Sequence, residues 1–221
     1  MNSLKEIFTI LEKSYGPQGW WPLSKGNLQT KHHNGRPETD NDRFEIIVGA
    51  ILTQNTSWNN VEKAIYNLNN SKMLDPKKIA AAKESDIAKL IRPAGYFNQK
   101  AKRLKFLSGY FIKNKELLNK ETSELRKELL SLNGIGPETA DSIILYAAEK
   151  PSFVIDTYTR RIFSRLLNKS LKDYDAWKQF FEANLESDVQ LYNEYHALIV
   201  EHAKRSCNKT PKCNGCILKS G

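Results

Sequence analysis

Apolar residues recur at the three-to-four-residue spacing of amphipathic helices along most of the chain. The pattern predicts about ten short helices, over residues 4–15, 43–54, 61–68, 86–91, 100–112, 125–132, 140–148, 160–167, 176–185 and 190–205. Only residues 152–155 have the β-branched character of a strand, and no second segment is an obvious partner for them. We therefore predict an all-α fold.

A polar segment from 24 to 42 lacks any periodicity, so we predict a long loop that joins the first helix to the body of the protein. His32 and His33 lie within it. The simplest interpretation of both is a solvated loop residue, with a ligand role as the alternative.

The charge of the chain restricts the class of partner. With 221 residues, 40% of them hydrophobic, the chain can bury a substantial core. Its net charge of +9 favours a polyanion, either nucleic acid or an acidic membrane surface. No apolar stretch approaches the roughly 20 residues of a membrane span, and the first residues do not resemble a secretory signal. We expect a cytoplasmic protein.

The stretch SLNGIGPETADSIILYA, residues 131–147, places two glycines directly before an apolar helical run. Gly134 and Gly136 allow backbone conformations closed to other residues, and Pro137 suits the first position of a helix. Backbone N–H groups and the positive end of the helix then point the same way, which suits a phosphate. The alternative is a turn that merely joins two packed helices, with Glu138 as an ordinary first-turn acid.

Asp156 closes the apolar run 152–155 and precedes another amphipathic helix. A carboxylate in this place is a good N-cap, which is a sufficient structural explanation. Held ionised beside a deoxyribose, it could also stabilise an oxocarbenium-like transition state or orient a water.

Taken together, the hairpin and Asp156 resemble the helix-hairpin-helix DNA glycosylases of the endonuclease III superfamily (HhH-GPD). Further motifs that carry the likeness are ILTQNT, GYFNQKAKRL and VIDTYTRR, at residues 51–56, 95–104 and 154–161. The resemblance implies a two-lobed helical fold. One lobe would span 43–148 and contain the hairpin at about 131–148; both termini, 1–42 and 149–221, would form the other, with a Cys-rich tail at 207–221.

The resemblance also implies roles for individual residues. Asp156 falls on the catalytic aspartate of the family, and Gln54 falls where members fill the gap left by the extruded base. Tyr96 falls on a wedge residue that enters the duplex. Gln54 and Tyr96 could equally be a helix-end polar residue and a core aromatic. The expected DNA-binding residues are Gln54, Tyr96, Lys100, Asn133, Gly134, Ile135, Gly136 and Thr139.

Glu138 stands where strand-cutting members carry a lysine that forms a Schiff base with the sugar. A carboxylate cannot form this imine, because the step requires an amine. The resemblance therefore implies a monofunctional glycosylase that leaves an abasic site.

Tryptophans suggest which base is removed. Trp20 and Trp21 precede Pro22, and Trp58 follows LTQNT, a combination similar to the endonuclease III-type 3-methyladenine DNA glycosylases. We expect a base pocket of Trp20, Trp21, Pro22, Trp58 and Glu138, in which aromatic rings hold a positively charged alkylated purine. A loop anchor packed on the domain is the alternative for the Trp-Trp-Pro segment.

Cys207, Cys213 and Cys216 lie close together near the end of the chain. Their spacing is similar to the family's iron–sulfur loop, Cys-x6-Cys-x2-Cys-x5-Cys, but the fourth cysteine would fall at position 222. A [4Fe–4S] cluster uses four thiolates, so three leave one iron short of a ligand. Either the cluster is incomplete or lost, or the chain stops short of it.

The leading hypothesis is thus a DNA glycosylase for alkylated purines, acting as a monomer on damaged double-stranded DNA and not on membranes. An endonuclease III-like enzyme for oxidised or mismatched pyrimidines is one alternative. A non-catalytic DNA-binding protein that uses the hairpin only for phosphate contact is the other.

Overall fold

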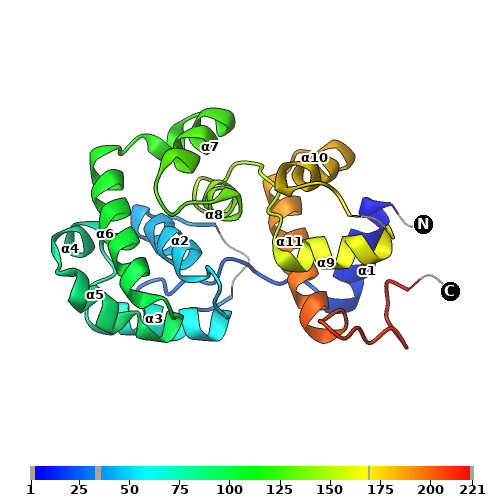
Figure 1. Ribbon diagram of the computed structural model, residues 1–221, viewed down its shortest axis with the longest axis horizontal. Coiled ribbons are helices and arrows are strands. Elements are labelled where there is room, and N and C mark those ends of the chain that lie inside the picture. Colours follow the sequence, from blue (N-terminus) through cyan, green and yellow to red (C-terminus); the bar gives the residue numbers. More distant parts are fainter. Residues whose placement is uncertain (1–2, 33–35, 169, 220–221) are drawn as a thin grey trace. The chain divides into compact units, whose positions relative to one another are not determined.

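The computed structural model describes residues 3–32, 36–168 and 170–219, and this part of the chain is helical (Figure 1). The only β-pairing among these residues is an isolated bridge between Leu23 and Lys31. The all-α prediction is confirmed. The helices are α1 (Leu4–Tyr15), α2 (Asp40–Leu52), α3 (Trp58–Asn70), α4 (Pro76–Ala81), α5 (Glu84–Leu90), α6 (Phe97–Lys113), α7 (Thr122–Ser131), α8 (Pro137–Ser142), α9 (Thr157–Leu166), α10 (Tyr174–Asn184) and α11 (Val189–Arg205), with the short helical turns η1 (Arg92–Ala94), η2 (Leu117–Asn119) and η3 (Ile143–Ala147).

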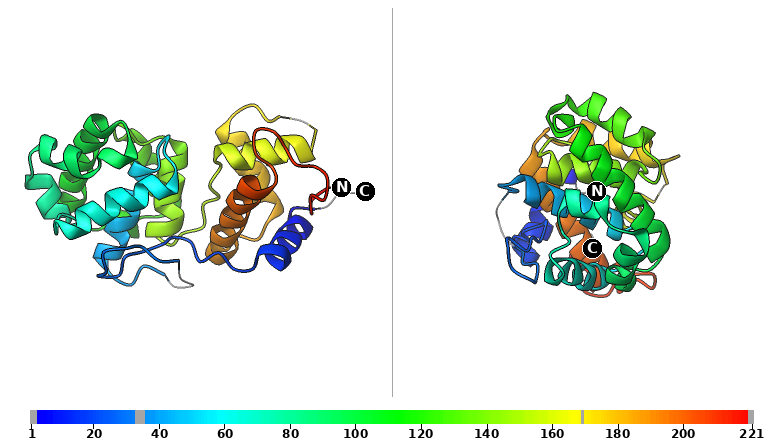
Figure 2. Two further views of the ribbon diagram at one scale, coloured as in Figure 1. Left: turned by 90° about the horizontal axis from the view of Figure 1, so that it is seen from below. Right: turned by 90° about the vertical axis from the view of Figure 1, so that its left-hand side faces the viewer.

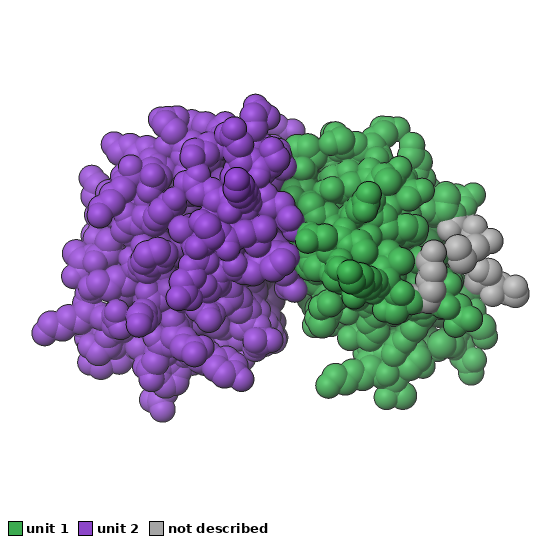
Figure 3. All heavy atoms as spheres, turned by 45° about the horizontal axis from the view of Figure 1, so that its top comes forward, with its two compact units in different colours: residues 1–20, 151–221 green, residues 21–150 purple. Residues whose placement is uncertain are grey.

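The chain divides into two compact units, shown in separate colours in Figure 3. Unit 1 comprises residues 1–20 and 151–221, and unit 2 comprises residues 21–150. Residues 21–42 therefore belong with the hairpin and not with the termini, which differs from the expected boundary at 43. The reason is local: Trp21 and Leu23 are buried in unit 2, and the Ser24 N–H and hydroxyl both donate to the Glu45 carboxylate on α2.

Unit 2 is built around α2. Nearly every residue of this helix from Phe44 to Leu52 is buried, and α3, α6, α8 and η3 pack against it (Figures 1 and 2). A helix that is apolar on all sides has no solvent face, so it forms the centre of its domain. Besides α2, the α6 helix packs against α4 and α5, which complete unit 2.

Unit 1 is held together by aromatic packing. Figure 2 shows α11, in orange, beside α9, in yellow, and α1, in blue. Phe153 stacks on Phe181 with ring centroids 4.3 Å apart, and Tyr195 meets the edge of both rings. The strand-like run 152–155 is extended but unpaired: the Phe153 N–H donates to Glu182 and the Ile155 N–H donates to the Tyr174 hydroxyl. Side chains thus satisfy buried backbone donors that a sheet would otherwise bind.

Several helices begin about one turn before their predicted first residue, and one helix was not predicted. The helix α4 is absent from the predicted set; Asp75 is its N-cap and Pro76 its first helical residue. The loop that begins at 24 ends at Thr39, which caps α2. His32 is exposed in this loop, and His33 lies outside the described residues.

Across the described ranges, no helix is both long and apolar enough to cross a bilayer.

Candidate active site

The predicted turn lies between α7 and α8, but only one of its two glycines adopts a conformation that favours glycine. Gly134 adopts φ +88°, a left-handed conformation that strains other residues, whereas Gly136 has an ordinary φ of −95°. Ile135 is buried and anchors the turn in unit 2, while Asn133 and Gly136 lie at the surface. The α8 helix begins at Pro137. The buried Ile135 side chain therefore fixes the position of the turn, whose residues on either side of it are exposed.

Gln54 lies against this hairpin from the end of α2. Its Nε2 donates to the Gly134 carbonyl at 2.9 Å and to the Thr139 hydroxyl at 3.0 Å, and its Oε1 accepts from Arg103 at 2.7 Å. Both ends of the amide are engaged in unit 2. A gap-filling role in DNA would require Gln54 to leave these three bonds, and Thr139 is buried rather than presented at the surface.

Lys100, an expected DNA contact, is instead buried in unit 2. Its side chain is 1% exposed, and its ammonium donates to carbonyl oxygens of Leu52, Gln54 and Ala94 and to the Thr56 hydroxyl, all within 3.0 Å. Cations and apolar residues are interspersed along α6, so its sequence alone does not show which cation faces the core.

Tyr96, directly before α6, is the opposite case. Its side chain is 68% exposed and its backbone is left-handed, with φ +44°. It is not the core aromatic that the sequence left open.

The Trp-Trp-Pro segment is shared between the units. Trp20 is partly exposed in unit 1, whereas Trp21 and Pro22 are buried in unit 2. Trp21 packs edge-on against Trp58 at a centroid distance of 5.4 Å and lies 5.1 Å from Tyr146. Trp21 thus anchors the segment, as the alternative interpretation required, and exposed indole surface remains on Trp20 and Trp58.

Trp21 also depends on Gly49 of α2. A Cβ at Gly49 would lie 2.8 Å from the Trp21 ring, so this glycine makes room for the indole.

Asp156 ends the buried run of unit 1 and caps α9. Its Oδ1 accepts from the Thr159 N–H at 2.7 Å, and its Oδ2 lies 3.7 Å from Nε2 of His196. Burial alone would raise the pKa of this carboxyl. Interaction with the His196 ring and the Thr159 donors outweighs burial and holds the pKa below its ordinary value. The carboxylate is therefore ionised at neutral pH.

Glu138, the other acid of interest, is exposed in the first turn of α8 in unit 2, where its backbone carbonyl accepts from the Ser142 hydroxyl. The hairpin thus begins its helix with a carboxylate rather than an amine.

Sequence reasoning missed His196 and Arg103. His196 lies on the buried face of α11 with Tyr192, Tyr195 and Ile199, a stripe that the helical spacing contains. Its approach to Asp156 depends on how α9 and α11 pack, which no local pattern specifies. Arg103 is one of several cations on α6, and nothing in the local sequence singles it out.

The three thiols do not form a cage for a metal cluster. The Cys207 Sγ accepts from Arg165, the Cys216 Sγ lies 3.7 Å from His202, and Cys213 is exposed. Within the described ranges, no three Cys, His, Asp or Glu side chains converge as metal ligands. The residues present do not fit a four-thiolate cluster.

The tail that carries these cysteines is held by arginines of α9. Arg161 donates to the Cys207 carbonyl, and Arg165 donates to the carbonyls of Asn208 and Lys209.

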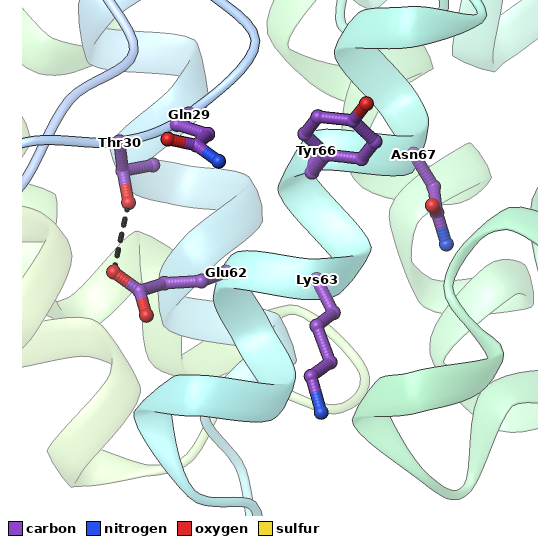
Figure 4. A pocket seen from close by; sticks show the side chains of 6 residues that line it. All are labelled: Gln29, Thr30, Glu62, Lys63, Tyr66 and Asn67. Atoms are coloured by element: carbon purple, nitrogen blue, oxygen red, sulfur yellow. Dashed lines mark hydrogen bonds between the residues drawn. The ribbon is translucent and has the colours of Figure 1, made fainter.

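A hollow of about 490 Å³ on unit 2 is separate from the residues above (Figure 4). Thr30 and Glu62 face each other across part of it and share a hydrogen bond of 3.1 Å. The residues that line it are Gln29, Thr30, Glu62, Lys63, Tyr66 and Asn67. It includes no residue of the expected base pocket.

A family model described as HhH-GPD superfamily base excision DNA repair protein matches residues 48–187, which include the hairpin and Asp156. The chain belongs to the HhH-GPD superfamily. The resemblance that its motifs indicated is confirmed, and the protein is a DNA glycosylase of this superfamily.

The three relatives described next each align with nearly the whole chain. A Methanocaldococcus jannaschii protein named "putative DNA repair glycosylase" is 48% identical over 97% of this chain and 93% of its own length. The crystal structure of H. pylori 3-methyladenine DNA glycosylase bound to 1,N6-ethenoadenine is similar at a TM-score of 0.75, with 32% identity over 92% of this chain and 98% of that one. A trapped endonuclease III–DNA covalent intermediate shares the fold at a TM-score of 0.76, with 20% identity over 99% and 94% of the two chains.

Replacing Gly134 with alanine should destabilise the hairpin. The new Cβ would be strained at φ +88° and would overlap the Arg103 side chain that holds Gln54. We expect the free energy of unfolding in urea to fall by about 2 kcal/mol. Gly136→Ala is the matched control, because φ is ordinary there and no atom lies within 4 Å of the new Cβ; its effect should stay below about 1 kcal/mol. Equal losses for both variants would contradict this assignment.

The stability contributed by Asp156 should depend on pH. Because its pKa is lowered in the folded state, the contribution is complete above the ordinary aspartate pKa of about 3.9 and is lost as pH falls through the lower folded value. The difference in unfolding free energy between the natural protein and Asp156→Asn should therefore be present at about pH 5 and shrink as the pH falls below about 4. A difference that persists unchanged to about pH 2 would refute the lowered pKa.

Proposed function

We propose that the protein is a monofunctional DNA glycosylase that hydrolyses the N-glycosidic bond of alkylated purines such as 3-methyladenine. The observation that carries the proposal is the pair of carboxylates. Glu138 lies in the first turn of α8, where strand-cutting relatives are expected to have a lysine, and Asp156 is the buried, ionised N-cap of α9. An acid in place of the amine removes the Schiff-base route and leaves hydrolysis.

Asp156 acts on the sugar in this scheme. As the glycosidic bond breaks, positive charge develops on the deoxyribose, and a fixed carboxylate stabilises that charge. The same carboxylate orients the water that adds to the sugar carbon. Thr159 holds one oxygen of the carboxylate through its N–H, so the group needs little reorganisation during the reaction.

The leaving base supplies the rest of the driving force. Alkylation at N3 or N7 gives the purine a positive charge, which weakens the glycosidic bond and removes the need for a strong general acid. The charge also allows recognition by cation–π attraction, for which the partly exposed indoles of Trp20 and Trp58 are suited. Trp21 and Pro22, which are buried in unit 2, and Glu138 are the other residues proposed for base recognition. The H. pylori relative, named for 3-methyladenine, supports this substrate class.

Damaged double-stranded DNA is the proposed partner, bound by a cytoplasmic monomer. The exposed backbone at Asn133 and Gly136 would contact one phosphate, with Gly134 and Ile135 shaping the turn, and Tyr96 would enter the duplex as a wedge. The net charge of +9 supports salt-sensitive binding to a polyanion.

The proposal is tested by incubating the protein with methylated duplex DNA and measuring free bases by chromatography. We expect release of 3-methyladenine, and we expect Asp156→Asn to lower the rate by at least about 100-fold, because an amide cannot offset the developing charge. Asp188→Asn is the matched control: Asp188 caps α11 through the same kind of bond, to the Leu191 N–H at 2.7 Å, and its variant should release the base at the natural rate.

Borohydride treatment during the reaction tests the second half of the proposal. Without an amine nucleophile, no covalent protein–DNA adduct should form and the strand should stay intact until base is added. A trapped adduct would overturn monofunctionality. Release of oxidised or mismatched pyrimidines without alkylated purines would favour the endonuclease III-like alternative, and salt-dependent binding without release from any lesion would favour a non-catalytic protein.

A further inference from the structure

Lys100 occupies an unusual place for a cation in a DNA-binding protein. Its ammonium has three N–H donors and lies 2.8–3.0 Å from four oxygen atoms inside unit 2. Two of them, the carbonyls of Leu52 and Gln54, belong to the end of α2 and the turn that follows. The Ala94 carbonyl belongs to η1, just before Tyr96. One side chain thus joins two turns that are about 40 residues apart in sequence.

Both turns contain a residue in a strained backbone conformation. Asn55 has φ +53° and Tyr96 has φ +44°, and neither is a glycine. The left-handed conformation costs roughly 1–2 kcal/mol for most residues with a Cβ, and less for asparagine. At Tyr96 it therefore persists only where the surroundings fix it. Lys100 binds the carbonyl directly before Asn55 and the carbonyl two residues before Tyr96. It therefore holds the chain at the points where the strain is stored.

The same helix also fixes the hairpin. Arg103 lies one turn after Lys100 on α6 and donates to the Gln54 side chain, which in turn donates to the Gly134 carbonyl. Lys100 holds the backbone of Gln54, and Arg103 holds its amide. Tyr96, Gln54 and the hairpin are consequently linked through α6 within one unit.

We propose that Lys100 is a positioning residue for DNA binding: it aligns Tyr96 with the hairpin by holding the two strained turns, and it makes no contact with phosphate. The inference rests on the proposed function only in that Tyr96 and the hairpin contact DNA. It does not depend on which base is removed.

The chemistry of the side chain agrees with this role. Burial lowers the pKa of Lys100 to about 8, and the nearby Arg103 charge acts in the same direction. The amine is still largely protonated at pH 7, so all three of its N–H donors are present when the enzyme works.

A double-mutant cycle tests the proposal. Binding is measured on a short duplex that contains a tetrahydrofuran abasic-site analogue, with the full chain at a temperature where circular dichroism shows each variant folded. Tyr96→Ala should weaken binding by about tenfold in the natural background, within the range for loss of a stacking contact. Lys100→Met should weaken binding by a similar factor, and Tyr96→Ala should then add less than twofold in the Lys100→Met background.

The salt dependence separates positioning from phosphate contact. Because Lys100 releases no counterion from DNA, the slope of log Kd against log salt should be the same for Lys100→Met as for the natural protein. Lys113→Met is the matched control, since it removes the same charge from the exposed end of α6. It should bind the analogue within twofold of the natural protein.

Additive effects of Tyr96→Ala and Lys100→Met would overturn the proposal, because a merely structural lysine does not change what Tyr96 contributes. A slope reduced by about one ion would show a phosphate contact instead and would also overturn it. Should Lys100→Met not fold, Thr56→Val takes its place, since it removes one of the four oxygens and leaves the lysine. Absence of base release from alkylated DNA would refute the substrate assignment alone and would leave this binding test intact.

Discussion

The last carbonyl groups of an α-helix have no partner within the helix, and in most proteins water satisfies them. At the end of α2 the Leu52 carbonyl is buried with the rest of the helix, so another group of the protein has to satisfy it. Thr53 and Gln54 donate to the carbonyls before Leu52, and the Lys100 ammonium donates to the Leu52 carbonyl itself. The same ammonium also binds the turn after α2 and the turn before α6. In the turn after α2, the Gln54 carbonyl accepts from Lys100 and the Gln54 side chain donates to the hairpin at Gly134. Before α6, Tyr96 adopts a left-handed conformation in which its side chain is exposed.

The two carboxylates that define the chemistry occupy contrasting environments. Asp156 is buried and accepts a backbone hydrogen bond, whereas Glu138 is exposed at the first turn of its helix. Both begin a helix, where negative charge is favoured, so helix position alone does not distinguish a catalytic acid from an ordinary one. What separates them is the contact with His196 and the exclusion of water around Asp156, which fix the charge and the orientation of that carboxylate.

Much of this architecture could be predicted from local pattern. The first helix agrees with its predicted range, 4–15, and the glycines and proline of 134–137 specify the hairpin through backbone geometry alone. Contacts between distant segments were not predictable in this way. Lys100 looks like any cation of a basic helix until the carbonyls of α2 are placed beside it, and Trp21 looks available until Gly49 is seen to make room for its ring. The missed helix α4 is too short to show a period.

The arginines of α9 bind the C-terminal tail by its main chain. Since Arg161 and Arg165 donate to carbonyl oxygens, which every amino acid supplies, most of this attachment does not depend on the side chains of residues 207–209. The tail can therefore exchange residues over evolutionary time, cysteines included, without leaving its place on unit 1.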